Sequence, residues 1–481
     1  MNFAIVRYLI GWMLGIESIF LLLPALTAVI YGEAELPAYL IAAAISLAGA
    51  ALLCHRKPKN TRFYAREGYV TVALCWLILA VIGALPFVLS REIPFFIDAL
   101  FETVSGFTTT GATILGDVEA LSHASMLWRC LTHWVGGMGV LVFMLIVLPL
   151  AGGQTIFLMR AESPGPAVSK MSPHMRDTAT ILYAIYFGLT VLQMILLLIG
   201  GMPFFDAICV SLGTAGTGGF GNWNDSIAHY NSAYLQNVIT VFMILFGINF
   251  SAYFLILTRK FRQAFRIEEI RVYLGVIFVF AGLIAFNVRP MFGSLRESFH
   301  HALFQVASII TTTGFSTVDF DQWPTFSRAL LVLLMFIGAC AGSTGGGIKC
   351  SRILLLGKSV KKEMMCLIHP RLVRVNKMDG QRVPHEVMRS INVFVVAYAF
   401  IFILSLLIIS LNCEDLVTCF TSVATTLNNV GPGLSLCGPT CNFDFFPPLS
   451  KCVLIFDMLA GRLELFPMLL LFTPGTWQRN K

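Results

Sequence analysis

Four short polar segments are the part of this sequence that could do chemistry. Each combines threonine or asparagine with glycine inside an otherwise apolar chain, and they read TVSGFTTTGAT, SLGTAGTGGFG, SIITTTGFST and TSVATTLNNVGPG. Hydroxyl and backbone carbonyl oxygens can replace the hydration shell of a cation when several of them converge on one point. These segments therefore predict a site that binds a dehydrated cation.

The four segments share one register. They align without gaps on the glycines Gly111, Gly219, Gly314 and Gly431. Glycine suits this position because carbonyl groups must point inward from a backbone with unusual torsion angles and little room. The residues expected to line the site are the triplets that end at these glycines: Thr109, Thr110, Gly111, Thr217, Gly218, Gly219, Thr312, Thr313, Gly314, Asn429, Val430 and Gly431.

A short apolar helix is predicted before each segment. At about twelve residues it is too short to cross a bilayer. Asp98 and Asp206 stand where they could cap the first two of these helices, whereas His301 and Thr418 take that position in the other two. One such segment alone would more often be a helix-breaking bend or a small-residue packing site. Four in register favour helices whose negative C-terminal ends point at one centre.

Membrane-spanning helices must position these segments. Hydrophobic residues make up 57% of the chain, charged residues 12%, and the mean hydropathy is +0.79. Soluble domains carry about twice that charged fraction. The apolar runs that approach or exceed a span are Phe3–Ile30, Ala38–Cys54, Val70–Leu89, Met126–Leu150, Ile181–Ile199, Val238–Leu257, Val272–Phe286, Ala329–Cys340, Ile391–Leu411 and Cys452–Phe472. The first run is too long for a cleavable signal peptide.

The predicted fold is an all-α polytopic membrane protein. Each polar segment lies between two spans, so the repeated unit is a helix, a pore helix, a loop and a helix. Four such units would surround one ion pore, with two extra N-terminal transmembrane helices. The expected boundaries are 1–67 for the N-terminal pair, then 68–176, 177–268, 269–383 and 384–481 for the four units.

Lysine and arginine are concentrated in alternate loops. These loops contain Arg56, Lys57, Lys59, Arg62 and Arg66, then the run RKFRQAFRIEEIR, then the stretch from Lys349 to Arg389. The positive-inside rule places them, and the N-terminus, in the cytoplasm. The intervening loops are acidic, which either concentrates cations or is ordinary solvation. Because the net charge of +7 is divided between sides in this way, we expect no nucleic-acid partner.

The stretch GACAGSTGGGIK, Gly338 to Lys349, interrupts the expected second span of the third unit. Its glycines each cost about 1 kcal/mol in a helix relative to alanine. Irregular backbone at this depth is tolerated beside a water-filled cavity, so the stretch is either a loop that blocks the pathway or a hinge or close helix contact. The candidate gating residues are Gly342, Ser343, Thr344, Gly345, Gly346, Gly347 and Lys349. Lys349 either contacts loop carbonyls or marks the cytoplasmic boundary.

Arg462 lies ten residues after Cys452 in the last apolar run. A charge near the bilayer centre costs several kcal/mol, so this side chain should face the bundle interior. It could pair with Asp457 or Glu464, but neither stands at the spacing that favours a pair on one helix. We therefore favour a position in the conduction path.

The four segments, together with GACAGSTGGGIKCSR and AGRLELFP, resemble the motifs of the TrkH/TrkG potassium-uptake proteins in the Trk/Ktr/HKT superfamily. The resemblance covers essentially the whole chain. It implies K⁺ uptake across the bacterial inner membrane through one pore per protomer, in a homodimer. It also implies that Arg462 lies against the gating loop, and that a cytosolic TrkA-type subunit binding NAD(H) or ATP controls opening. K⁺ would be the transported ion, and no organic cofactor is expected in this chain.

The sequence departs from a regular ring of channel loops. None of the loops is the TVGYG of tetrameric K⁺ channels, and Gly218, Asn429 and Pro432 make the four quarters unequal. Selectivity among cations is therefore expected to be looser. Flux could also be coupled to H⁺ or Na⁺, since a symporter would use the same filter. The pair Cys437 and Cys441 could close a small disulfide, which the spacing alone does not decide.

Three other function classes compete with a cation pore. A transporter of organic solutes usually has twofold inverted repeats, and a membrane scaffold would not need four matched loops. For an intramembrane enzyme, the candidates are Glu102 in the first pore helix and the pair Arg129 and His133 on one span. The sequence contains no HExxH, GxSxG or Gly-Lys-Ser motif and no paired carboxylates, so we expect no enzyme.

Overall fold

The computed structural model describes residues 1–58, 64–151, 175–371 and 375–478. Within these ranges the chain is helical, apart from an antiparallel hairpin of β1 (Lys377–Met378) and β2 (Gln381–Arg382). Six of its helices are long and apolar enough to cross a membrane, or seven if one bent pair counts as a span. The predicted all-α, multi-pass class is therefore confirmed. The basic residues Lys59 and Arg62 lie outside the described residues.

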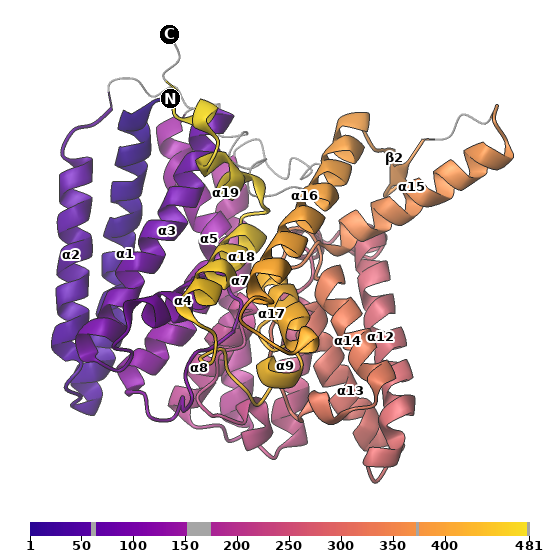
Figure 1. Cartoon of the computed structure of the whole chain (residues 1–481), viewed down its shortest axis with the longest axis horizontal. Coiled ribbons are helices and arrows are strands. Elements are labelled where there is room, and N and C mark those ends of the chain that lie inside the picture. The colour runs from indigo at the N-terminus through magenta and orange to yellow at the C-terminus, as the bar shows by residue number, and fades with distance from the viewer. Residues whose placement is uncertain (59–63, 152–174, 372–374, 479–481) are drawn as a thin grey trace.

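Long helices form the body of the molecule (Figure 1). They are α1 (Phe3–Tyr31), α2 (Leu36–Cys54), α3 (Ala65–Ser90), α5 (His123–Ala151), α7 (Met175–Ile199), α12 (Glu268–Val288), α15 (Cys350–Ile368) and α16 (His385–Ile409). The predicted N-terminal pair, α1 and α2, packs at one side of the bundle beside α3, whereas α15 projects from the opposite side. The first residue lies beside the last described one, since the Met1 amino group donates to the Gln478 carbonyl at 3.2 Å.

Four short helices lie in the half of the molecule away from the termini (Figure 1). They are α4 (Phe96–Phe107), α8 (Phe204–Gly216), α13 (Leu295–Ile310) and α17 (Leu416–Asn428). With 12 to 16 residues each, they match the predicted short helices. Each is followed by a polar loop and a further helix, which is α5 in the first unit. In the others it is α9 (Ala233–Phe246), α14 (Thr325–Ile337) and α18 (Pro448–Arg462).

The predicted capping roles of Asp98 and Asp206 are wrong. Helices α4 and α8 begin earlier, so both residues lie in the first turn and cap no backbone N–H. Side chains elsewhere bind both carboxylates instead: Asp98 accepts a hydrogen bond from Lys451 Nζ at 2.6 Å. Asp206 accepts one from the Tyr230 hydroxyl at 2.7 Å. Negative charge in a first turn still favours the helix dipole.

The other two short helices are capped by residues that the alignment did not select. Ser294 caps α13, and Asp415 caps α17 by accepting from the N–H groups of Val417 and Thr418 at 3.2 and 3.0 Å. Hydrogen bonds from the hydroxyls of Thr418 and Ser435 lower the pKa of Asp415 to about 2. The capping carboxylate is therefore ionised under physiological conditions.

Two predicted spans are broken rather than continuous. Val238–Leu257 is divided into α9 and α10 (Phe250–Leu257), which are bent by 93°. At the break, a Cβ atom on Gly247 would lie 2.3 Å from the Tyr273 hydroxyl, and Asn249 caps α10 by accepting from the Ser251 N–H at 2.8 Å. Cys452–Phe472 is divided into α18 and α19 (Phe466–Leu471), and between them Glu464 and Leu465 have positive φ values of 57° and 67°. The remaining short helix is α11 (Phe261–Ala264).

Helices α1 and α2 are in close contact at a glycine. A Cβ atom on Gly11 would lie 2.6 Å from Cys54 Sγ and 3.2 Å from the Cys54 backbone nitrogen. Small residues at such crossings let helices approach and gain van der Waals contact in a membrane. Gly188 on α7 is exposed and has nothing within 4 Å of that position.

We therefore expect Gly11→Leu to destabilise the protein by about 1–3 kcal/mol, the usual cost of overpacking a tight contact. The measurement is the thermal unfolding midpoint of the purified protein in detergent micelles. Gly188→Leu is the matched control and should leave the midpoint unchanged. Equal midpoints for the two variants would show that the α1–α2 contact adapts without strain.

Candidate cation site

The four polar loops repeat the same hydrogen bonds. In each, the middle residue of the triplet donates its N–H to the carbonyl five residues earlier, at 2.8 or 2.9 Å. The four bonds run from Thr110 to Ser105, from Gly218 to Gly213, from Thr313 to Ser308, and from Val430 to Thr425. The gap-free alignment of the sequence is thus also the structural register of the loops.

The loop backbones share an uncommon conformation. The first residue of each triplet has φ between 55° and 58°, and the closing glycine has φ between 82° and 99°. Non-glycine residues at positive φ cost of order 1–3 kcal/mol, and such strain clusters at ligand sites. Thr109, Thr217, Thr312 and Asn429 therefore hold the same strained position in the four units.

The four loops close into a ring. Each glycine lies against a carbonyl of the next unit, so that an added Cβ atom would clash with it. The distances from such a Cβ are 2.0 Å from Gly111 to Gly218 O, 1.9 Å from Gly219 to Thr313 O, 2.5 Å from Gly314 to Val430 O, and 2.7 Å from Gly431 to Thr110 O. The circle returns to its start, and all twelve predicted residues meet in it.

Side chains hold the ring unequally. In the first and third units a hydroxyl pair joins the loop to its helix, Thr108 to Thr110 at 2.8 Å and Thr311 to Thr313 at 2.7 Å. The fourth unit instead uses Asn429, whose amide donates to Thr110 Oγ1 at 3.0 Å. Asn429 Oδ1 and Thr109 Oγ1 are buried oxygens with no partner within the described chain.

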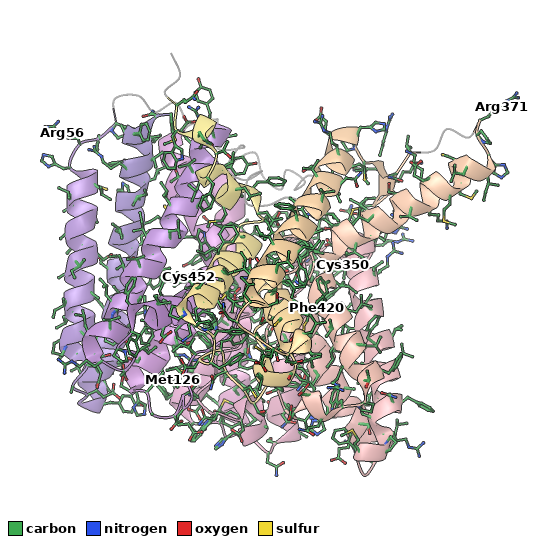
Figure 2. The ribbon with its side chains drawn as sticks, in the orientation of Figure 1. Arg56, Met126, Cys350, Arg371, Phe420 and Cys452 are labelled. Atoms are coloured by element: carbon green, nitrogen blue, oxygen red, sulfur yellow. The ribbon has the colours of Figure 1, made fainter. Side chains whose placement is uncertain are left out.

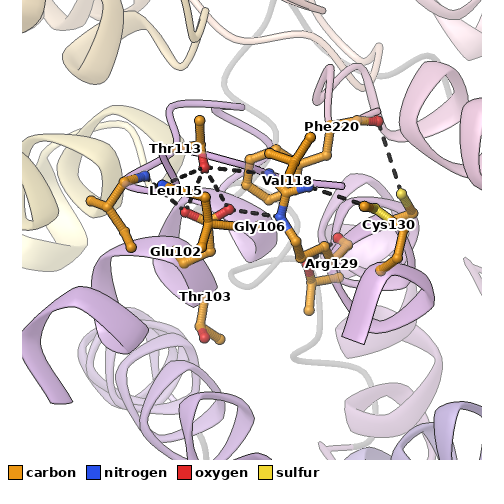
Figure 3. A network of polar contacts seen from close by, with 12 residues as sticks. Glu102, Thr103, Gly106, Thr113, Leu115, Val118, Arg129, Cys130 and Phe220 are labelled. Atoms are coloured by element: carbon orange, nitrogen blue, oxygen red, sulfur yellow. Dashed lines mark hydrogen bonds and ion pairs between the residues drawn. The ribbon is translucent and has the colours of Figure 1, made fainter. Parts of the chain in front are cut away.

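A buried ion pair supports the first two loops (Figure 3). Arg129 Nε lies 2.7 Å from Glu102 Oε1, and the same carboxylate accepts from the Thr113 hydroxyl at 3.0 Å. The Arg129 guanidinium lies 3.9 Å from the Phe220 ring centre and reaches the Gly221 carbonyl at 3.4 Å. A buried ion pair of this kind holds the side chains around it in one arrangement, but it is weak evidence for a gain in the free energy of unfolding. Sequence reasoning considered both residues only as enzyme candidates and missed this role.

His133 is structural. Phe220 N–H donates to its Nε2 at 3.1 Å, so the proton lies on Nδ1 and is donated to the Gly106 carbonyl at 2.8 Å. Both ring nitrogens are therefore used in joining α5 to α4 and to the second loop. In the part of the chain that the structure describes, no three His, Cys, Asp or Glu side chains group as a metal site. Cys437 and Cys441 are free thiols.

The Gly338–Lys349 segment lies directly against the ring. Gly346 N–H donates to Thr312 Oγ1 at 2.6 Å, and Gly347 N–H donates to the Asn428 carbonyl at 3.0 Å. A Cβ atom on Gly346 would lie 2.4 Å from that carbonyl. Lys349 Nζ donates to the Gly345 carbonyl, so the lysine contacts the loop. The predicted interruption of the helix is present, since α14 ends at Ile337.

Arg462 joins this segment to α5. Its two terminal nitrogens donate to the carbonyls of Thr344 and Gly136, each at 2.8 Å. The two carboxylates considered as partners are engaged elsewhere. Glu464 pairs with Arg352, and Asp457 accepts from the Ser405 hydroxyl at 2.7 Å.

Known proteins are similar to this chain in sequence and in fold. The family model described as TrkH, cation transport protein, matches residues 37–478. The "Trk system potassium uptake protein TrkH" of Salmonella typhimurium is 38% identical, over 99% of this chain and 100% of that protein. TrkG of Escherichia coli is 33% identical over 98% of both chains. The crystal structure of the potassium transporter TrkH from Vibrio parahaemolyticus matches with a TM-score of 0.90 and 32% identity, over 99% of this chain. The chain therefore belongs to the TrkH family of cation transport proteins, which are transporters and not enzymes.

Proposed function

We propose that this protein takes up K⁺ across the bacterial inner membrane through a single pore. The observation that carries the proposal is the closed ring of four glycine-containing loops, each pressed against a carbonyl of the next. The relatives named as potassium uptake proteins support the choice of ion. K⁺ is the substrate here, and the chain supplies no organic cofactor.

The twelve ring residues serve as the selectivity filter. Three of the four glycines are partly exposed, so the ring borders open space. Backbone carbonyls there would replace the water shell of the ion, while the C-terminal ends of α4, α8, α13 and α17 add negative potential. The chain then consists of an N-terminal pair, 1–67, and four pore units, 68–176, 177–268, 269–383 and 384–481. Because different side-chain contacts hold the four loops, we expect modest selectivity for K⁺ over other monovalent cations.

The Gly338–Lys349 segment serves as the gate. It contacts the ring at Thr312 and Asn428, so an ion leaving the filter on that side would meet it. Arg462 adds a fixed positive charge against the same segment. Opening would require Gly342, Ser343, Thr344, Gly345, Gly346 and Gly347 to move aside.

The end of the molecule that carries both termini faces the cytoplasm. Arg56 and Arg371 mark this end (Figure 2), and the basic loops follow the positive-inside rule. We propose a homodimer that binds a cytosolic TrkA-type subunit, itself a binder of NAD(H) or ATP. We propose that this subunit binds the basic surface formed by residues between Lys358 and Arg389. Its chemistry is suited to an acidic protein face rather than to a nucleic acid.

Flux into vesicles tests the proposal. Purified protein in proteoliposomes should take up ⁸⁶Rb⁺ when a negative interior potential is imposed, without any ion gradient. Uptake that requires a pH or Na⁺ gradient would instead identify a symporter on the same fold. Absence of uptake under all three conditions, together with failure to rescue a K⁺-uptake-deficient bacterium, would overturn the function.

Gly219→Ala should abolish uptake. The added methyl group would lie 1.9 Å from the Thr313 carbonyl, and φ is 82° at this residue, so the ring must open to admit it. Gly221→Ala in the same loop is the matched control, since its nearest neighbour would be 3.9 Å away. We expect control flux within about twofold of the unmodified protein, because the added methyl group meets only ordinary van der Waals contact. Equal fluxes in the two variants would contradict the filter.

Arg462→Ala should raise the flux measured without the cytosolic subunit. A positive charge about 4 Å from the ion path raises the energy of a passing cation by roughly 1–4 kcal/mol. Removing it should therefore increase the flux about tenfold. Arg462→Lys keeps the charge and should keep most of the barrier, although it cannot bridge both carbonyls. If alanine and lysine variants conduct equally, the charge is no barrier and the bridge to Thr344 is the operative contact.

A further inference from the structure

Glu269 binds the Gly338–Lys349 segment near its start, and the first turn of the helix that follows it, α15, with one oxygen atom. Its Oε1 accepts from the Ala341 N–H at 2.7 Å and from the Ser351 N–H at 3.0 Å. Glu269 lies in the first turn of α12, and only 3% of its surface is exposed. A carboxylate buried to this degree requires such partners. Nothing in the spacing of the sequence pointed to this residue.

The start of the segment and the first residue of α15 are also joined to each other. Cys350 N–H donates to the Ala339 carbonyl at 3.0 Å, directly beside the two groups that Glu269 binds. The incoming end contacts the break between α9 and α10, where Phe250 N–H donates to the Gly342 carbonyl at 3.0 Å. Removing the Glu269 carboxylate would leave two buried N–H groups unpaired, which costs more than the loss of exposed hydrogen bonds.

We propose that Glu269 is the positioning residue that keeps this segment in its blocking position, an inference that rests on the gate proposed above. Other contacts hold the segment along its length: Gly346 N–H donates to Thr312, Phe250 N–H donates to the Gly342 carbonyl, and Arg462 donates to the Thr344 carbonyl. A single acceptor that binds the start of the segment and the helix after it fixes the width of the loop where it leaves and re-enters the helices. The loop can then move as one piece only when Glu269 moves or releases it.

The neighbouring residue connects this site to the cytoplasmic side. Glu268 pairs with Lys358 of α15, and its N–H donates to Asp379 Oδ1 in the turn between β1 and β2 at 2.7 Å. Lys358 Nζ also donates to the Lys377 carbonyl of β1 at 2.8 Å. A displacement of the hairpin would therefore reach the first turn of α12, and with it Glu269.

The test compares three substitutions in proteoliposomes without the cytosolic subunit. Glu269→Ala should raise ⁸⁶Rb⁺ flux about tenfold, because both N–H partners lose their acceptor. Glu269→Gln retains an amide oxygen that can accept both bonds and should remain near the flux of the unmodified protein. Glu386→Ala is the matched control, since Glu386 also lies in the first turn of a long helix, α16, but is exposed.

Native cysteines give a second measurement. Cys340 lies in the segment and Cys350 directly follows it, and both are buried. Cys130 is buried elsewhere, against α8 and its loop. In Glu269→Ala, alkylation by N-ethylmaleimide should accelerate at Cys340 and Cys350 but not at Cys130, as followed by mass spectrometry. Acceleration at all three would show a general loss of structure and overturn the specific role.

The outcomes separate this inference from the gate itself. If Arg462→Ala raises flux while Glu269→Ala changes neither flux nor alkylation, the positioning role is wrong and the gate stands. If the protein conducts and neither substitution raises flux, the gate is wrong and the inference falls with it. If Glu269→Gln opens the pathway as fully as Glu269→Ala, the charge rather than the two accepted bonds is responsible, and the proposal as stated is overturned.

Discussion

Contact between glycine and carbonyl, repeated around a ring, is the constraint on which the rest of this structure depends. Each key glycine leaves no room for a methyl group between its own loop and the next. Four loops can approach this closely only if four short helices carry them inward and hold them at the same depth. The hydrogen bond from the middle residue of each triplet back to its helix sets that depth in every unit.

The same close approach extends to the helices that follow the loops. A Cβ atom on Gly136 of α5 would lie 1.8 Å from the Phe107 carbonyl at the end of α4, and one on Gly461 of α18 would lie 2.1 Å from the Leu427 carbonyl at the end of α17. Phe107 and Leu427 each stand four residues before a ring glycine. These helices therefore need glycine where they cross the end of a pore helix, and Arg462 binds the carbonyl of one such glycine.

The features that could be predicted from the sequence are those set by local spacing and composition. Hydropathy identified the spans, and a gap-free alignment found the twelve ring residues, because both depend on short-range regularities. The caps of α4 and α8 were wrong because Lys451 and Tyr230, distant in sequence, bind Asp98 and Asp206. The breaks after α9 and α18 were missed since an apolar run does not reveal a crossing. Glu269 was missed because its partners are backbone groups more than seventy residues away.

The four loops share one backbone conformation, but the side chains behind them differ between alternate units. Hydroxyl pairs stand behind the first and third loops, whereas Gly216 with Gly218 and Asn428 with Val430 occupy the same positions in the second and fourth. The Gly338–Lys349 segment contacts the third loop at the Thr312 hydroxyl and the end of α17 at the Asn428 carbonyl. The first contact uses a hydroxyl that Thr109 and Thr217 also carry, and the second uses a backbone carbonyl, which every unit has. The segment therefore takes one position beneath the ring because it is tethered between α14 and α15 of the third unit, and not because the ring offers a single matching contact.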